Sequence, residues 1–353
     1  MKLNTRDKLV TWFCNNYKTN VDIMKATNHF PDHRTDHSFH GEGSVWTHTM
    51  MVMTHIQCDN TLSDTDKQIL LTVALLHDIG KPLSRQVKDD GEKFSFEGHE
   101  GLSVFLAIDI LNSMEIEDDF YSNSMRIKIL ELISLHGTYI LQTDTHMKML
   151  QTRFRVADKE GAIRNVDENI FAQYPAKKVS SRKRVESEKE LVILVGLPGS
   201  GKTTYCKNYL SNYFTISRDY EMLKYFERHN IECSDNVSNN EIYNFVNQEE
   251  HIDIFNMEFN EFVDNISKKE SKVVIDMTML TFGKRRKILN RFSKFKAKCF
   301  VFLSGETNIK KINDKRWKSN AGLTKERFIT LKKKFIMPLK EEGFEEVEIF
   351  LRD

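Results

Sequence analysis

A glycine-rich motif in the second half of the chain constrains its fold more than any other feature. Residues 196–203 read GLPGSGKT, the pattern G-x-x-x-x-G-K-[ST], and directly follow the apolar run LVILV. This order predicts a buried strand, a tight turn and a helix. Glycines allow the backbone N–H groups of the turn to curl around phosphate groups, and the helix N-terminus adds positive potential. Residues 191–353 are therefore predicted to bind a nucleoside triphosphate such as ATP.

Lys202, Thr203 and Arg316 of this region are predicted to contact the triphosphate or its Mg²⁺ ion. Lys202 would reach the β- and γ-phosphates, and the Thr203 hydroxyl would complete the shell of a Mg²⁺ ion. Arg316 lies in a basic segment, residues 308–322, and would act from a mobile lid by neutralising charge on the transferred phosphoryl group. The expected nucleotide-binding residues are Gly196, Pro198, Gly199, Ser200, Gly201, Lys202, Thr203, Thr204 and Arg316.

Five β-rich runs separated by longer helical stretches predict an α/β domain with a parallel sheet. They are residues 191–195, 214–217, 273–276, 299–303 and 346–350. Asp219 follows the second run and could accept a hydroxyl proton as general base, or could cap a helix. Asp276 ends the third run and could hold the metal shell or position the acceptor. The basic cluster 284–286 could contact phosphates or form a solvated helix face.

The first half of the chain has a different pattern. Residues 66–79, 101–114 and 124–135 carry apolar residues at a spacing of three to four, which predicts helices. The chain has 353 residues, enough for two or three domains. Residues 175–190 are polar and highly charged and form either a linker or a solvated helix. The expected organisation is an all-α domain at 1–172, a linker at 173–190 and an α/β domain at 191–353.

Charge and histidine are unevenly distributed between these halves. Residues 1–174 hold 18 Lys and Arg against 25 Asp and Glu, whereas residues 175–353 hold 34 against 26. Ten of the twelve histidines lie before residue 150, and His77 and Asp78 are adjacent in the segment ALLHDIGKP. Mixed nitrogen and oxygen ligands suit Mn, Fe, Co, Ni or Zn better than Mg²⁺ or Ca²⁺. The candidate metal ligands are His48, His77, Asp78, His99, His136 and Asp158, besides Thr203 for Mg²⁺.

In the second half, the segments GLPGSGKTT, ISRD, VIDMT, KKINDKRW and KKKFIMP resemble, in that order, the 5′-hydroxyl polynucleotide kinase family. The resemblance implies that Asp219 is the general base for the 5′-OH, Asp276 engages the acceptor and Arg316 is the lid arginine. The chain departs from the family at two places. Met222 stands where an arginine sometimes follows the base, and Thr278-Met279 replaces the usual T-N pair.

In the first half, HDIGK and VADKEG resemble the HD phosphohydrolase superfamily, an all-helical metal-binding fold, over residues 35–165. FEGHEG resembles the branch related to the HD domains of tRNA nucleotidyltransferases. The resemblance implies phosphoester hydrolysis, in which one metal activates water and a second stabilises the opposite oxygens. His99 and His136 would hold the second metal or the phosphate. Lys81 would neutralise a phosphate oxygen.

Together the two halves resemble bifunctional proteins that join an HD domain to a polynucleotide kinase and heal nucleic-acid ends. The expected activities are phosphorylation of a 5′-OH and removal of a 2′,3′-cyclic, 2′- or 3′-phosphate from RNA or DNA, before a separate RNA ligase acts. Two alternatives are a nucleotide phosphohydrolase fused to a small-molecule or nucleoside kinase, and a non-catalytic nucleic-acid-binding module. The longest apolar runs are too short for a membrane span, and five scattered cysteines suit a reducing cytoplasm, so a cytoplasmic protein without membrane partners is expected.

Overall fold

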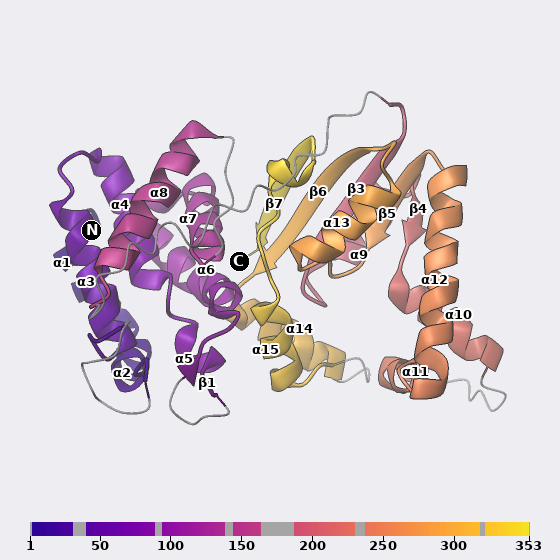
Figure 1. Cartoon of the computed structure of the whole chain (residues 1–353), viewed down its shortest axis with the longest axis horizontal. Helices are drawn as coiled ribbons and strands as arrows, with labels where there is room; N and C mark the ends of the chain where they lie inside the picture. Colours follow the sequence, from indigo (N-terminus) through magenta and orange to yellow (C-terminus); the bar gives the residue numbers. More distant parts are fainter. Residues whose placement is uncertain are drawn as a thin grey trace. The chain divides into compact units, whose positions relative to one another are not determined.

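Two units make up the fold of this chain in the computed structural model (Figure 1). The structure describes residues 2–30, 40–88, 94–137, 144–163, 187–229, 237–317 and 322–352. The first unit comprises residues 1–180 with 329–337, and the second comprises residues 181–328 with 338–352. Residues 173–186 of the expected linker lie outside the described residues.

The first unit is helical, as the apolar spacing predicts. Its only described strands, β1 (Gln86–Val87) and β2 (Phe94–Ser95), form a short antiparallel pair. Its helices are α1 (Arg6–Asn16), α2 (Lys18–Ala26), α3 (Val45–Cys58), α4 (Asp64–Leu76), α5 (Lys81–Ser84), α6 (His99–Glu117), the short 3-10 helix η1 (Asp119–Tyr121), α7 (Asn123–Leu135) and α8 (Thr145–Glu160).

Helix α4 lies at the centre of this unit. It begins where the Ser63 hydroxyl accepts a hydrogen bond from the Asp66 backbone N–H at 3.1 Å, and acidic residues in its first turn favour the helix dipole. Every residue from Gln68 to Leu76 is buried. A helix that is apolar on all sides must be surrounded by others, and α4 packs against α3, α7 and α8. This packing fixes the position of the α4 C-terminus, where the HD pair begins.

A segment from late in the chain, residues 329–337, completes the first unit. Phe335 is buried, with its ring 5.3 Å from that of Phe105 on α6. The Met337 backbone N–H donates to the Ser134 hydroxyl of α7 at 2.8 Å. Gly101 on α6 has no room for a side chain, because a Cβ there would lie 2.1 Å from the Lys332 carbonyl oxygen. Two segments that are far apart in the sequence, residues 1–180 and 329–337, therefore build this helical unit.

The second unit is α/β, with five parallel strands in the order β4-β5-β3-β6-β7. The strands are β3 (Glu190–Gly196), β4 (Phe214–Ile216), β5 (Lys272–Asp276), β6 (Lys296–Ser304) and β7 (Glu346–Arg352). The helices are α9 (Lys202–Tyr209), α10 (Arg218–His229), α11 (Asn239–Val246), α12 (Glu249–Lys269), α13 (Phe282–Arg291) and α14 (Glu306–Trp317), with the 3-10 helix η3 (Lys340–Glu342). Helix α15 (Lys325–Lys333) begins in this unit, and its residues from 329 on belong to the first unit. Strand β3, the predicted LVILV run, is buried at the sheet centre (Figure 1). The predicted fold class, an all-α region followed by an α/β domain, is confirmed.

A buried ion pair ties α13 to the C-terminal part of the second unit. Arg285 is fully buried and donates from Nε and Nη2 to the two carboxylate oxygens of Glu342, at 2.7 and 2.6 Å. Its Nη1 donates to the Met279 carbonyl at 3.1 Å. This arrangement excludes the phosphate contact that the basic cluster 284–286 could have made through Arg285. The residue is structural.

Candidate active sites

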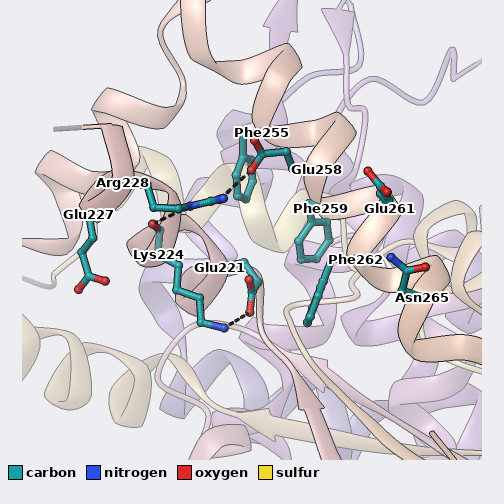
Figure 2. A pocket seen from close by; sticks show the side chains of 10 residues that line it. All are labelled: Glu221, Lys224, Glu227, Arg228, Phe255, Glu258, Phe259, Glu261, Phe262 and Asn265. Carbon is teal, nitrogen blue, oxygen red and sulfur yellow. Dashed lines mark hydrogen bonds and ion pairs between the residues drawn. The ribbon is translucent and has the colours of Figure 1, made fainter. Parts of the chain in front are cut away.

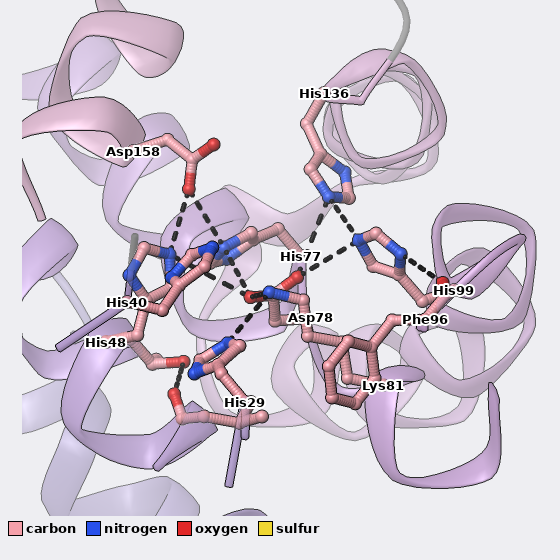
Figure 3. Close-up of polar contacts among 12 residues, drawn as sticks. His29, His40, His48, His77, Asp78, Lys81, Phe96, His99, His136 and Asp158 are labelled. Atoms are coloured by element: carbon pink, nitrogen blue, oxygen red, sulfur yellow. Dashed lines mark hydrogen bonds and ion pairs between the residues drawn. The ribbon is translucent and has the colours of Figure 1, made fainter. Parts of the chain in front are cut away.

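Helix ends bring six of the predicted metal ligands together in the first unit (Figure 3). His77 caps the C-terminus of α4 and is followed by Asp78, while His136 caps the C-terminus of α7. The other three are His99, which begins α6, His48 in α3 and Asp158 in the last turns of α8. Asp78 lies at the centre of this group and is 1% exposed.

The six side chains form two groups that share Asp78. In the first, Asp78 Oδ2 lies 3.2 Å from His77 Nε2 and 3.9 Å from His48 Nε2. Asp158 Oδ1 adds an oxygen at 3.0 Å from His48 Nε2 and 3.4 Å from His77 Nε2. The nitrogens of His48 and His77 and the oxygen of Asp78 are close enough together to ligate one metal ion, and Asp158 lies beside the two histidines.

The second group lies on the other side of the same carboxylate. Asp78 Oδ1 is 3.2 Å from His99 Nε2 and 3.7 Å from His136 Nε2, and the two imidazole nitrogens are 3.0 Å apart. One oxygen of Asp78 thus faces each group. A carboxylate shared in this way is suited to hold two metal ions side by side, as in two-metal phosphoesterases.

The Nδ1 atoms of the four histidines point away from the centre, so the Nε2 atoms face it. Each Nδ1 lies 2.7–3.2 Å from a backbone carbonyl oxygen, which can only accept, so each Nδ1 carries the proton. Each Nε2 therefore faces the centre, the orientation that carbonyl partners usually impose on metal-binding histidines. The pairs are His48 with Gly161, His77 with Ala74, His99 with Phe96 and His136 with Ile133.

The electrostatics of the centre fit cations. Neither oxygen of Asp78 accepts a hydrogen bond of ordinary geometry from the described residues. The buried His77 Nε2 also has no hydrogen-bond partner among them. Burial would raise the pKa of Asp78, but the charges of His77 and Lys81 hold it well below its ordinary value. Burial is likewise outweighed at His77, whose pKa Asp78 and Asp158 raise to about 10. A metal ion that binds here must displace a proton from His77.

Lys81 and three residues that sequence reasoning missed surround this centre. Lys81 Nζ lies 2.7 Å from Asp78 Oδ2 and 3.1 Å from His29 Nε2. Glu42 Oε1 accepts from His40 Nδ1 at 2.8 Å and lies 3.1 Å from His48 Nδ1. The only signal for His29, His40 and Glu42 was the density of histidines before residue 49, because their spacing matches no motif.

The glycine-rich motif of the second unit forms a loop between β3 and α9. Gly199 and Gly201 have φ values of 83° and 96°, which favour glycine. Lys202 begins α9 and is buried, and its Nζ donates to the carbonyls of Gly196 and Leu197 at 2.9 and 2.8 Å. Burial is the main reason that its pKa falls to about 8, although Asp276 and Asp219 act in the opposite direction, and nearby Arg316 adds a smaller lowering effect. Pro198, buried Ser200 and exposed Thr204 complete the predicted set.

The predicted partners of Lys202 come from three separate segments. The Thr203 hydroxyl donates to Asp276 Oδ2 at 2.7 Å, because β5 lies beside β3 with Asp276 paired to Leu194. Asp219 lies inside α10, which begins at Arg218, so it does not occupy the helix N-cap. A Cβ on Gly199 would lie 3.7 Å from Arg316 Cδ, which places α14 against the loop.

A groove of about 640 Å³ lies beside α10 but does not belong to this site (Figure 2). Its charged residues pair with one another, as in Lys224 with Glu221 at 3.0 Å and Arg228 with Glu258 at 2.7 Å. Because its cations are neutralised and further glutamates line it, the groove is unsuited to phosphate. Its lining residues are Glu221, Lys224, Glu227, Arg228, Phe255, Glu258, Phe259, Glu261, Phe262 and Asn265.

Comparison with known proteins agrees with this division. Residues 45–164 match the HD domain family, and residues 191–338 match a family described as AAA domain. A crystal structure of a kinase candidate from Chloroflexus aurantiacus J-10-fl aligns with 47% of this chain and 86% of its own, at 14% identity and a TM-score of 0.34. No curated protein matches the chain. Among the described residues, no helix is both long and apolar enough to cross a membrane. The chain therefore combines a helical unit that matches the HD domain family with an α/β unit that matches the AAA domain family.

Proposed function

We propose that this protein heals nucleic-acid ends by two phosphate reactions in one chain. The P-loop domain would transfer the γ-phosphoryl group of ATP to a 5′-OH end. The HD domain would remove a 2′,3′-cyclic, 2′- or 3′-phosphate. The observation that carries the proposal is that Asp276 bonds to Thr203 and Arg316 lies against the glycine-rich loop, since these residues belong to the segments that resemble polynucleotide kinases.

In the kinase reaction, Asp219 accepts the proton of the 5′-OH while that oxygen attacks the γ-phosphorus and ADP leaves. Lys202 binds the β- and γ-phosphates, and Arg316 neutralises the charge that develops on the transferred group. Asp276 orients Thr203 through their hydrogen bond and helps place the acceptor. A Mg²⁺ ion held near Thr203 would supply further charge neutralisation to the triphosphate.

In the hydrolase reaction, the HD cluster would hold divalent metal ions. His48, His77 and Asp78 fit one ion, to which we assign Asp158 as a further ligand because it contacts His48, and Asp78, His99 and His136 fit a second. The oxygens of Asp78 accept no hydrogen bond of ordinary geometry from the described residues, which supports this assignment, and the mixed donors favour Mn, Fe, Co, Ni or Zn. When bound, the metals would activate water and neutralise phosphoryl oxygens. Lys81 adds a positive charge beside Asp78 for one phosphate oxygen.

The chemistry of the two products suggests the next reaction. Removing the 3′-end phosphate leaves a hydroxyl, and phosphorylating the 5′-end supplies the phosphate that a ligase activates. RNA breaks with a 5′-OH and a cyclic phosphate need both repairs before joining. We therefore infer RNA or DNA ends as substrates and a separate RNA ligase as the enzyme that acts next.

Single-site variants test the separation of the two activities. Lys202→Ala and Asp219→Ala should abolish phosphate transfer to a 5′-OH oligonucleotide and leave 3′-end hydrolysis intact. His77→Ala should do the reverse. Arg316→Ala should slow transfer by roughly 10²-fold or more, and Arg316→Lys should restore it partly, since a planar fork is replaced by a point charge.

Substrate choice tests the nucleic-acid assignment. The same kinase assay is run with a 5′-OH oligoribonucleotide, a 5′-OH oligodeoxyribonucleotide and a mononucleoside, each with radiolabelled ATP and Mg²⁺. Transfer to either oligonucleotide supports end healing. Transfer to the mononucleoside alone would contradict it and favour a nucleoside kinase fused to a nucleotide phosphohydrolase.

A further inference from the structure

Lys81 reaches the metal centre from a buried position that His29 shares. Its ammonium is buried, and its Nζ lies 2.7 Å from Asp78 Oδ2 and 3.1 Å from His29 Nε2 (Figure 3). The ring of Phe96 covers another side, with its centroid 5.6 Å from Nζ. An ammonium has three N–H donors. One is donated to His29 Nε2, and the ammonium also forms an ion pair with Asp78 Oδ2, so an N–H remains for a ligand of the centre.

The hydrogen bonds of His29 define its charge. Lys81 can only donate, so His29 Nε2 must accept. His29 Nδ1 lies 3.0 Å from the Gly43 carbonyl oxygen, which can only accept, so Nδ1 carries the proton. The ring is therefore a neutral imidazole. It holds the Lys81 ammonium in place without adding a second negative charge beside that of Asp78.

Neighbouring residues keep the His29 ring in this orientation. His40 stacks on it, with ring centroids 4.1 Å apart and an angle of 10° between the planes. His40 in turn bonds to Glu42, the carboxylate that also approaches His48. His29, His40 and Glu42 could by distance alone ligate a metal ion. The ammonium of Lys81 already contacts His29 Nε2, so a cation ligated by that nitrogen would meet its charge.

We propose that His29 is a positioning residue, which aims the Lys81 ammonium at a phosphate oxygen of the substrate in the HD centre. The proposal rests on the proposed hydrolase function. Lys81 then acts as a fixed cation beside the two metal groups. His29 contributes only through Lys81, so its effect must disappear when Lys81 is absent.

The test measures binding of inorganic phosphate to the Mn²⁺-loaded full-length protein by calorimetry, together with hydrolysis of bis(p-nitrophenyl) phosphate. The variants are His29→Leu, His29→Gln, Lys81→Met and the double variant His29→Leu/Lys81→Met. Glutamine keeps an acceptor and a donor, so it should stay within about threefold of wild type. His29→Leu should weaken phosphate binding and kcat by roughly tenfold or more, the range seen for residues that orient a site. Elemental analysis should show unchanged metal content in all four.

The double variant gives the decisive comparison. It should be no weaker than Lys81→Met alone. A further tenfold loss in the double variant, or wild-type phosphate affinity in His29→Leu, would overturn the positioning role while the hydrolase assignment stands. Loss of metal from His29→Gln would also overturn it, because His29 would then be a structural part of the metal groups. A wild-type protein that neither binds phosphate nor hydrolyses any phosphodiester or phosphomonoester would refute the hydrolase function and the inference together.

Discussion

Replacing His136 with alanine should separate the two metal groups of the HD centre. The second group consists of Asp78, His99 and His136, so the variant leaves it with two ligands. The first group keeps His48, His77, Asp78 and Asp158, because none of these contacts involves His136. We therefore expect two metal ions in the wild-type protein and one in His136→Ala.

The size of the effect follows from mass action. A ligand at 100 times its dissociation constant stabilises the folded state by about 2.7 kcal/mol. Two ions would contribute about 5 kcal/mol, and one ion about half of that. In a unit the size of residues 1–180, 1 kcal/mol shifts Tm by about 2–4 °C. Metal should thus raise the wild-type Tm by about 10–20 °C and the variant Tm by about half as much.

Elemental analysis after gel filtration counts the ions, and calorimetry with and without EDTA measures the shift. His55→Ala is the matched control, since His55 is an exposed histidine of the same unit whose ion-pair partner among the described residues is Glu160 at 3.4 Å. It should keep two ions and the full shift. A wild-type protein that holds at most one ion, or a His136→Ala protein that keeps two, would refute the arrangement around a shared Asp78.

Three further predictions concern the other parts of the chain. Burial lowers the pKa of Lys202 to about 8 from 10.5, so the unfolded chain binds more protons between these values and stability rises with pH there. Binding of ATP at pH 8.5 should then be accompanied by proton uptake, measured as a difference in binding heat between two buffers of different ionisation enthalpy. The uptake should be lost in Lys202→Met, and equal binding heats in both buffers would contradict the prediction. Glu342→Gln leaves the buried Arg285 charge without its partner and should lower the free energy of unfolding in urea by about 3–5 kcal/mol; a loss below about 1 kcal/mol would contradict this. Gly101→Ala should lower the melting temperature by the equivalent of about 1–3 kcal/mol. Gly283→Ala should not, because a Cβ there would meet no neighbouring atom within 4 Å. Equal melting temperatures for the two variants would contradict the close approach at Gly101.

The spacing of apolar residues predicted the strands and helices because each segment has the periodicity of the element that it forms. LVILV, buried on both faces, could only be a central strand of a parallel sheet, and β3 lies there. The apolar spacing at 101–114 predicted α6 at nearly its full length. The short pair β1 and β2 was not predicted, since two-residue strands carry no periodicity. The placement of residues 329–337 in the first unit depends on tertiary packing, for which the sequence has no local signal.

The sites show a similar division. Residues next to a recognisable motif, such as Lys202 and Asp78, could be singled out by spacing and chemistry alone. His29 and Glu42 could not, because they act through contacts with Lys81 and His48 that only the folded chain creates. Arg285 shows the opposite case. Its position in a basic run indicated an exposed cation, yet the fold buries it against Glu342. The roles of the gathered site residues stay predictions that the variants above test.

The central claim is that one chain repairs both ends of a nucleic-acid break. The most direct measurement uses an oligoribonucleotide with a 5′-OH and a 2′,3′-cyclic phosphate, incubated with ATP, Mg²⁺ and Mn²⁺ and analysed by mass spectrometry. We predict a product with a 5′-phosphate and a free 3′-end hydroxyl. The Lys202→Ala protein should fail to phosphorylate the 5′ end, and the His77→Ala protein should fail to remove the phosphate from the 3′ end. An oligonucleotide that leaves with both ends unchanged would contradict the account.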